Sequence, residues 1–432
     1  MNRSQEVRID ITTAILKELG SRVGVPCSLR LIEELYDEVI QEWEQIDRSI
    51  KDLTGFTDTI DYTGRTARAN HYAVIAGKFL FDDPYKFCKS KTSSGNLTTS
   101  LTKPDLEYYQ TKMTGKRKEL VSLLLKMAST NHLLNATRSH RMHVTSYAMT
   151  RTDSKDKDIV WIPTNYEMGK TGRITNDNIS VQNMAPRLRE TVKAPEGYKL
   201  ISCDIKAQEV VICINAVFRD NELKKIYLEE GDCYRALLRR VGFEITKETR
   251  NLAKIPILGK IRGMSDNTVY RDMGEKNKEL ARAMLNYINN EPGMKAILEM
   301  ARKEANSQAP RLRGLFKSTF PLILTDKEER QSEKAKVEMK MRKILSAVFQ
   351  TTAAEMLCYS LGRIFLQQIE GDIPNGKDFM FLIPIHDEVI FMAREDLVEE
   401  AKAIIDKEFL VSVNGWVPFK GEFAVGEHYV SK

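Results

Sequence analysis

Acidic residues close two apolar segments of this sequence. Asp204 ends the segment LISCD, and Asp387 and Glu388 lie inside the segment IPIHDEVIF. An ionised carboxylate beside apolar strands needs a cation or several hydrogen bonds, and carboxylate oxygens are ligands that suit divalent metal ions. An acid in a hairpin turn also serves ordinary turn formation. This pattern alone therefore leaves a metal site and simple turn chemistry open.

Two cations lie four residues apart in the segment KETRNLAKIPILGKIRGMS, residues 247–265. On a helix, Arg250 and Lys254 are neighbours on one face. Arginine offers a planar fork of donors and lysine a compact charge, so the pair could bind the outer phosphates of a nucleotide held by a metal at the acids. A basic pair on a solvated surface helix has the same spacing, and the pair alone does not separate the two.

The segments that carry these residues predict a mixed α+β architecture. A strand is expected over 198–206, and a strand, a turn and a second strand over 377–394, with His386–Glu388 at the turn. Helical periodicity covers 5–55, 105–134, 207–217, 233–241, 247–261, 276–288, 293–306, 329–368 and 398–409. A break in the long helix is possible near Thr351, and the polar stretch 89–105 predicts a mobile loop.

Composition restricts the class of protein. The chain has 432 residues, 42% hydrophobic and 29% charged, which are ordinary globular values and predict two to four domains. No apolar run approaches the roughly 18–20 residues that span a bilayer, and no secretory leader is expected at the start. The six cysteines form no C-x-x-C pair, so neither a disulfide framework nor a thiolate zinc site is predicted. These features favour a cytoplasmic protein with reduced thiols and no membrane partner.

Positive charge is concentrated in two tracts. The sequence has 66 Lys and Arg against 60 Asp and Glu, a net charge of +6. Cations are dense over 112–141 and again over 311–343, which suggests a polyanionic partner. Solvated helix faces would give the same pattern.

Taken in order along the chain, these blocks resemble DNA polymerases of family A, the group of bacterial DNA polymerase I and many phage replicases. TGRITNDNISVQNMAP is similar to the family's T-G-R-L-S-S…L-Q-N-I-P stretch, and APEGYKLISCDIKAQEVVI resembles motif A. KETRNLAKIPILGKIRGMS resembles motif B, MRKILSAVFQTTAAEML resembles R-x-x-x-N-x-x-x-Q-G-T-A-A-D, and IHDEVIF resembles motif C. The resemblance implies a right-hand polymerase fold with an antiparallel palm sheet, helical fingers and a helical thumb.

The resemblance also implies domain boundaries. Residues 1–160 would form an N-terminal helical region and the thumb, and residues 161–218 the first part of the palm, with motif A. Residues 219–310 would form the fingers, with motif B, and residues 311–432 the second part of the palm, with motif C. No room remains for a proofreading exonuclease domain on this chain, so a separate exonuclease or processivity factor is an expected partner.

Roles at the reaction centre follow residue by residue from the resemblance. Asp204 and Asp387, with the backbone carbonyl of Ile205, would hold two Mg²⁺ ions, for which Mn²⁺ could substitute. Glu388 would lie beside this metal site as a further catalytic residue. The implied activity is template-directed addition of dNTPs to a primer 3′-hydroxyl, in replication or repair of DNA in a bacterium or a phage-infected cell.

The nucleotide and the DNA would be bound by further positions of the same motifs. Arg250 and Lys254 would grip the triphosphate, Glu209 would act as a steric gate against a ribose 2′-hydroxyl, and the remaining nucleotide-binding residues would be Tyr234, Leu258 and Arg262. The expected contacts to primer-template DNA are Arg173, Gln182, Asn183, Arg342, Gln350 and His386.

Departures from the family pattern predict altered fidelity or substrate tolerance. Leu258 and Arg262 stand where the family has a Phe and a Tyr that stack near the new base pair, and Tyr234 replaces a His. Pro256 lies in mid-helix, where proline removes a hydrogen bond and is expected to kink the helix. Two alternative functions are a single-subunit RNA polymerase-like enzyme and a catalytically weakened homologue that serves as a DNA-binding subunit.

Overall fold

The protein is described by a computed structural model that covers residues 15–17, 23–56, 65–91, 97–99, 101–153, 155–169, 173–176, 184–316, 319–385, 387–410 and 415–429. It divides into two compact units. The smaller unit comprises Ser28–Thr150 and Met184–Thr191, and the larger unit comprises Met1–Cys27, Arg151–Asn183 and Val192–Lys432.

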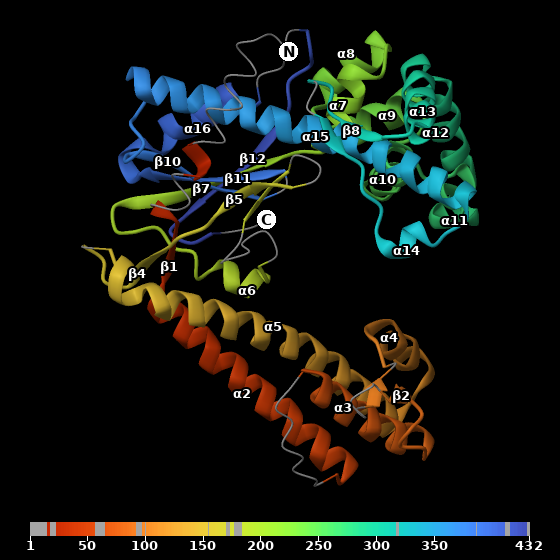
Figure 1. The fold of residues 1–432 in the computed structure, drawn as a ribbon, viewed down its shortest axis with the longest axis vertical. Helices are drawn as coiled ribbons and strands as arrows, with labels where there is room; N and C mark the ends of the chain where they lie inside the picture. Colours follow the sequence, from red (N-terminus) through yellow and green to blue (C-terminus); the bar gives the residue numbers. More distant parts are fainter. Residues whose placement is uncertain are drawn as a thin grey trace. The chain divides into compact units, whose positions relative to one another are not determined.

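Long helices dominate the smaller unit (Figure 1). Its elements are α2 (Leu29–Thr54), α3 (Arg65–Phe81), β2 (Cys88–Lys91), β3 (Leu97–Thr99), α4 (Lys103–Lys112), α5 (Gly115–Arg151) and α6 (Pro186–Arg189). Ser28 caps α2 by accepting a hydrogen bond from the Leu31 N–H, and Gly55 ends the helix in the left-handed conformation. Apolar side chains of α2, α3 and α5, including Ile50, Leu80 and Leu120, form a core of their own.

Two segments of this unit differ from the sequence prediction. The polar stretch 89–105 was expected to be a loop, but β2 and β3 pair antiparallel there and α4 begins at Lys103. The helix expected over 105–134 is instead two helices, because Met113 leaves the helical conformation and caps α4. A capping box between Thr102 and Asp105 fixes the start of α4. Local hydrogen bonds therefore determine the secondary structure of this region, which lacks apolar periodicity.

A four-stranded antiparallel sheet organises the larger unit. Its strands are β7 (Tyr198–Ile205), β10 (Phe379–Ile385), β11 (Glu388–Arg394) and β12 (Gly421–Gly426), in the order β10-β11-β7-β12. The two central strands are mostly apolar and buried in their middle, with LISC in β7 and VIFMA in β11, as expected where elements cover the sheet. Helix α16 (Val398–Phe409) packs on β7 and β11 and against α15 (Glu333–Glu370).

Helices form most of the rest of the larger unit. They are α7 (Gln208–Ala216), α8 (Asn221–Glu230), α9 (Cys233–Arg240), α10 (Lys247–Ile261), α11 (Asp266–Met273), η3 (Glu275–Asn277), α12 (Lys278–Asn290), α13 (Pro292–Ala305), α14 (Asp326–Glu329) and η4 (Glu395–Leu397). Short strands complete it: β1 (Val25–Ser28), β4 (Ile159–Ile162), β5 (Tyr166–Met168), β6 (Ile174–Asn176), β8 (Arg311–Arg313) and β9 (Thr319–Pro321).

Helix α15 connects the sheet region to the cluster of helices α7 to α13 (Figure 1). The break considered near Thr351 is absent, because α15 is continuous from Glu333 to Glu370. Thr351 and Thr352 are buried, and the Thr352 hydroxyl donates to the Val348 carbonyl at 2.5 Å. A threonine bonded to its own helix in this way does not interrupt it.

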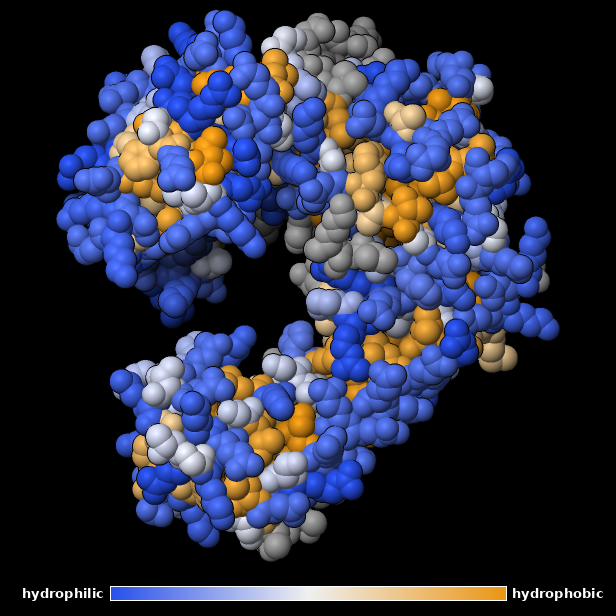
Figure 2. Space-filling view, turned by 180° about the vertical axis from the view of Figure 1, so that it is seen from behind, coloured by the Kyte–Doolittle hydropathy of each residue, from blue (hydrophilic) through white to orange (hydrophobic). Residues whose placement is uncertain are grey.

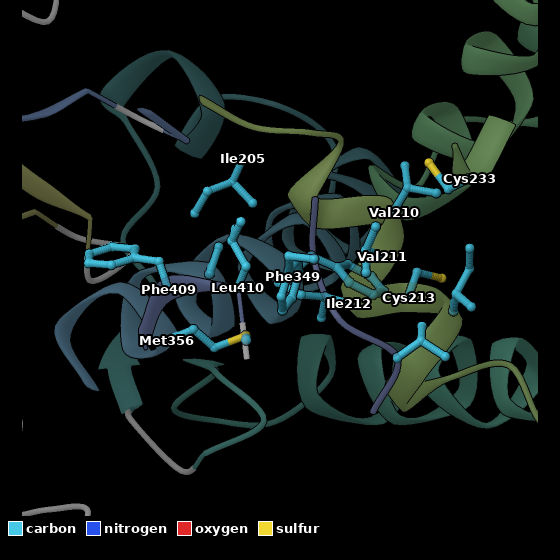
Figure 3. Packing of buried hydrophobic residues seen from close by; sticks show 14 of the residues in the cluster. Ile205, Val210, Val211, Ile212, Cys213, Cys233, Phe349, Met356, Phe409 and Leu410 are labelled. Carbon is cyan, nitrogen blue, oxygen red and sulfur yellow. The ribbon is translucent and has the colours of Figure 1, made fainter. Parts of the chain in front are cut away.

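One hydrophobic core joins the sheet to these helices. Figure 3 shows part of it, with Val210, Val211 and Ile212 of α7, Phe349 of α15 and Phe409 of α16 among the labelled side chains. Because α7 follows β7 after two residues, its burial fixes the end of the strand that carries Asp204. The core thus fixes the end of β7, where an acidic side chain was expected.

The surface shown in Figure 2 is mostly hydrophilic, and hydrophobic residues appear there in small groups. Among the residues that the structure describes, no helix combines the length and the apolar character needed to cross a membrane. Five described cysteines are buried and form no disulfide: Cys27, Cys203, Cys213, Cys233 and Cys358.

Candidate active site

The acidic residues predicted at the strand ends meet at one end of the central strands. The register of β7 and β11 places Glu388 opposite Asp204. Asp387 is the exposed turn residue just before Glu388, and its backbone carbonyl accepts a hydrogen bond of 2.8 Å from the Ile205 N–H. Residues separated by more than 180 positions in the sequence are therefore joined through the backbone. The sheet, rather than side-chain packing, sets their arrangement.

Negative charge is crowded around Asp204. Burial raises the pKa of this carboxyl to about 6, and the charges of Asp387, Glu388 and Glu422 add to that rise, whereas Lys206 opposes it. Glu422 lies opposite Asp204 on the other neighbouring strand, and it pairs with Lys206 at 2.5 Å. Like charges that raise a pKa in this way are relieved by a bound cation.

The donor set suits magnesium. Mg²⁺ usually binds through one or two carboxylates and completes its shell with water and substrate phosphates, whereas a closed protein cage is more typical of other metals. Within the described ranges, no group of three or more His, Cys, Asp or Glu side chains encloses a metal position. The carboxylates of Asp204 and Asp387, at neighbouring points of the sheet edge, are donors of the kind that an open magnesium site uses.

The predicted triphosphate cations share one aromatic ring. The Arg250 guanidinium lies 5.5 Å from the centre of the Tyr234 ring, and the Lys254 ammonium lies 5.8 Å from it. Arg250 also forms an ion pair with Asp232, with its Nη2 at 2.6 Å and its Nε at 2.7 Å from the same carboxylate oxygen. The Tyr234 ring thus lies beside both predicted triphosphate cations, and Asp232 holds one of them, Arg250.

Helix capping explains why Asp232 is available for this contact. Asp232 is the N-cap of α9, and its Oδ1 accepts from the N–H groups of Tyr234 and Arg235. Its Oδ2 remains for Arg250.

Pro256 lies inside α10, where a kink was expected. The helix runs from Lys247 to Ile261 without interruption at the proline. The proline therefore does not end the element that carries the cations.

A pocket of about 310 Å³ brings many of the predicted residues together. It lies within the larger unit, and elements from β6 to the β10–β11 turn contribute to its wall. The predicted site residues that line it are Arg173, Glu209, Tyr234, Leu258, Arg262, Gln350 and Asp387. The pocket is large enough for part of a nucleotide, and it places charged groups of both signs around that volume.

Glu209 lies between two arginines at this pocket. Its Oε1 is 3.2 Å from the Arg173 Nη2, and its Oε2 is 3.4 Å from the Arg262 Nη2. The turn from β7 to α7 passes through Ala207, which has a φ of 49°. A non-glycine residue in the left-handed region is uncommon and is often found at functional sites. This tight turn places Glu209 in the first turn of α7, four residues after Ile205.

Some predicted residues lie elsewhere or cannot be placed. Arg342 does not line the pocket and packs instead against Gly263, where an added Cβ would lie 3.0 Å from the Arg342 Cγ. Gln182, Asn183 and His386 lie outside the described residues.

Three contacts of the site were not predicted from the sequence. Asp232 is in the same GDCYRA segment as Tyr234. The sequence could have indicated its N-cap position, but not its ion pair with Arg250. Glu422 reaches Asp204 only through the pairing of β12 with β7. Tyr429 donates a hydrogen bond of 2.8 Å to Glu388. The last two depend on strand order, which no local pattern encodes.

The basic tracts are only partly free for a polyanion. In the tract 311–343, Lys343 pairs with Glu328 at 2.6 Å, and Lys336 pairs with Glu329 and Glu333. In the tract 112–141, Arg141 pairs with Glu33 at 2.6 Å. Internal pairing therefore accounts for part of the charge that suggested such a partner.

The sequence agrees with a known family over most of its length. Residues 77–431 match the family model described as DNA polymerase family A. The chain belongs to DNA polymerase family A. It is 27% identical over 242 residues to DNA polymerase I of Pseudomonas aeruginosa, a match that covers 53% of this chain and 25% of that protein. It is 23% identical over 270 residues to the thermostable DNA polymerase I of Thermus filiformis, covering 60% of this chain and 31% of the relative.

The structural comparison agrees with this membership in a family A fold. The chain is similar to the POL domain of Pol1 from M. smegmatis, solved in complex with DNA primer-template and dNTP, with a TM-score of 0.71 and 18% identity. The match covers 98% of this chain and 70% of that one. The predicted α+β right-hand polymerase fold with an antiparallel palm sheet is therefore confirmed. The domain boundaries and the roles of single residues remain predictions.

Proposed function

We propose that this family A chain catalyses template-directed DNA synthesis, adding dNTPs to a primer 3′-hydroxyl. The observation that carries the proposal is the register of β7 and β11, which brings Asp204 next to the turn that holds Asp387 and Glu388. The pocket beside this turn is also lined by Glu209 and by Leu258 of α10. The chain spans only about a quarter to a third of the length of its two relatives named above, so the activity itself is a proposal.

Asp204, Asp387 and the Ile205 carbonyl are the residues proposed to hold Mg²⁺, or Mn²⁺ in its place. Two such ions would supply charge stabilisation for the attacking and leaving oxygens of phosphoryl transfer. The chain's own contribution is to hold Asp204 and Asp387 at neighbouring points of the sheet edge. The hydrogen bond between the Ile205 N–H and the Asp387 carbonyl does this by fixing the turn to β7.

Arg250 and Lys254 are proposed to bind the triphosphate. A bidentate arginine and a lysine can neutralise charge that develops on phosphate oxygens during the reaction. The Tyr234 ring lies beside both cations and restricts their positions without adding charge. Asp232 orients the Arg250 guanidinium through its Nε and Nη2 edge, and this contact leaves Nη1 available for a phosphate.

Glu209 is proposed to exclude the ribose 2′-hydroxyl, and this residue favours dNTPs over the RNA polymerase-like alternative. Its side chain is held from two sides by Arg173 and Arg262. Leu258 and Arg262 line the same pocket and would contact the incoming nucleotide. A leucine offers less stacking to a base than an aromatic ring does, so altered fidelity remains part of the proposal.

Primer-template DNA is the proposed partner, with Arg173 and Gln350 at the pocket and Arg342 further along α15. His386, Gln182 and Asn183 keep their proposed DNA contacts as predictions from the family motifs. The same substrate suggests action in the cytoplasm of a bacterium or of a phage-infected cell. Replication and repair are both compatible with this reaction, and a separate exonuclease or processivity factor is a further proposed partner.

Primer extension tests the proposal. Wild-type protein with Mg²⁺ should extend a primer with dNTPs in preference to rNTPs, and Asp204→Asn and Asp387→Asn should abolish extension while keeping DNA binding. Arg271→Gln is a suitable control, because the Arg271 side chain is 75% exposed and forms its ion pair in the described part of the chain with the adjacent Asp272. Preference for rNTPs would favour the RNA polymerase-like alternative. DNA binding without any extension would favour the DNA-binding subunit.

A further inference from the structure

The C-terminal segment after β12 returns to the strand that carries Asp204. The Ala194 N–H donates to the Glu427 carbonyl at 2.8 Å, and the Tyr429 N–H donates to the Val192 carbonyl at 2.9 Å. Lys193 and His428 form a bridge between these two bonds. The backbone at Tyr429 is therefore fixed to the segment that leads into β7.

The side chain of Tyr429 reaches the acidic end of β11. It is 1% exposed, and its hydroxyl donates a hydrogen bond of 2.8 Å to the Glu388 Oε2. Glu388 lies opposite Asp204 and follows Asp387 directly. A residue 41 positions further along the chain thus contacts the hairpin from which both proposed catalytic acids of motif C project.

The chemistry of the donor suits a site that must remain negative. The charges of Asp387, Glu388 and Glu422 all act on Asp204, so these acidic side chains repel one another, and the hydrogen bond from Tyr429 opposes that repulsion at Glu388. A hydrogen bond to a charged acceptor is stronger than one between neutral groups. A phenol supplies this bond without adding a positive charge. A positive charge here would cancel part of the field that attracts a divalent cation.

We propose that Tyr429 is a positioning residue of the polymerase centre: its hydroxyl fixes the Glu388 carboxylate and thereby orders the turn that presents Asp387. This inference rests on the proposed polymerase activity. Tyr429 itself does not touch the reacting atoms. Its effect is transmitted through one hydrogen bond and through the short backbone connection between Glu388 and Asp387.

Tyr227 provides a matched control within the same unit. It is 2% exposed, and its hydroxyl donates to the Pro418 carbonyl at 2.9 Å. Tyr227→Phe and Tyr429→Phe therefore each remove one hydroxyl and its part-buried hydrogen bond. Only the second variant removes a contact to an acid of the candidate active site.

The decisive experiment is a double-mutant cycle measured by single-turnover primer extension at saturating primer-template. Loss of a hydrogen bond to a charged group predicts that Tyr429→Phe lowers kcat about tenfold, with the dNTP KM unchanged within about twofold because the bond acts on the chemical step. Tyr227→Phe should retain wild-type kcat. In the Glu388→Gln background, Tyr429→Phe should lower kcat much less, because the charged acceptor of the hydrogen bond is already absent. Equal losses in both backgrounds, or equal losses from both tyrosine variants, would overturn the inference.

Hydrogen exchange of the metal-free protein separates this inference from the proposed function. Tyr429→Phe should speed amide exchange at Val389 and Ile390, and Tyr227→Phe should leave it unchanged. If the wild-type protein does not extend primers, the proposed function fails, and the exchange rates alone then decide whether Tyr429 orders the hairpin. Unchanged exchange at both amides in Tyr429→Phe would refute the positioning role.

Discussion

The ion pairs of Glu209 bear on its proposed role as a gate against a ribose 2′-hydroxyl. The carboxylate is held by Arg173 at 3.2 Å and by Arg262 at 3.4 Å, and Arg262 lies at the end of α10. Arg262→Gln removes one of these two charges and leaves the other in place. We expect the gate to become more mobile and the preference for dNTPs over rNTPs to fall.

The exposures of the three side chains set the magnitude. The Glu209 side chain is 13% exposed, but Arg262 is 55% and Arg173 36% exposed. Solvent-exposed ion pairs contribute about 0.2–1 kcal/mol, and the burial of Glu209 favours the upper end of that range. About 1 kcal/mol corresponds to a loss of roughly fivefold in discrimination. Arg173→Gln/Arg262→Gln should lose more than the sum of the single variants, since no arginine then holds the carboxylate.

The assay is the ratio of kcat/KM for a dNTP to kcat/KM for the matching rNTP in primer extension. Arg262→Lys should keep most of the discrimination, and Glu209→Ala should lose far more than Arg262→Gln. Arg271→Gln, on an exposed part of α11, is the control for loss of a positive charge. If Glu209→Ala reduces discrimination while Arg262→Gln and the double variant leave it unchanged, the α7 backbone alone positions the gate and the reasoning is wrong.

Three further predictions concern stability and fidelity. Gly293→Ala should lower the free energy of unfolding by roughly 1–3 kcal/mol in urea titrations, because its Cβ would lie 1.8 Å from the Val217 carbonyl oxygen; Gly376→Ala, whose nearest contact is 4.0 Å away, is the control and should have little effect. Burial and the positive charge of His143 lower the pKa of His140 from 6.5 to about 4, so the unfolded chain binds a proton more readily, and stability should fall as the pH drops from 6.5 to 4, by up to about 3 kcal/mol; a His140→Gln variant with the same pH dependence as wild type would contradict this. Leu258→Phe should tighten dNTP binding by part of the roughly 1–3 kcal/mol per stacked base and lower misincorporation, and unchanged error rates in a gap-filling assay would count against a role for Leu258.

Local patterns predicted the elements of the site well. The strand–turn–strand expected over 377–394 is β10 and β11, and the helix expected over 398–409 is α16 with the same ends. These segments have long apolar runs or clear periodicity, and the structure around them agrees with their intrinsic preference for strand or helix. The hairpin β2–β3 was missed because its polar residues give no periodic signal, so only the pairing of its backbone identifies it.

Contacts between distant segments could not be predicted in the same way. Glu422 lies opposite Asp204 because β12 pairs with β7, and the Tyr429 hydroxyl reaches Glu388 from a segment whose backbone is bonded to Val192 and Ala194. Strand order depends on the packing of the whole larger unit, and a one-residue shift in register would turn these side chains to the other face. Family motifs identified Glu209 and Arg262, but neither motif indicates that the two form an ion pair.

The pairing of charges in the candidate site suggests how the protein keeps cations ready for an anionic substrate. Arg250 is held by Asp232, and Arg262 shares Glu209 with Arg173. Each of these arginines is positioned by a carboxylate. An arginine held in this way loses less conformational entropy on binding a phosphate than a mobile side chain would. Lys254, by contrast, has no ion pair in the described part of the chain, and the Tyr234 ring is its neighbour. Of the two cations proposed to bind the triphosphate, Lys254 is therefore the one that no carboxylate of the described chain compensates.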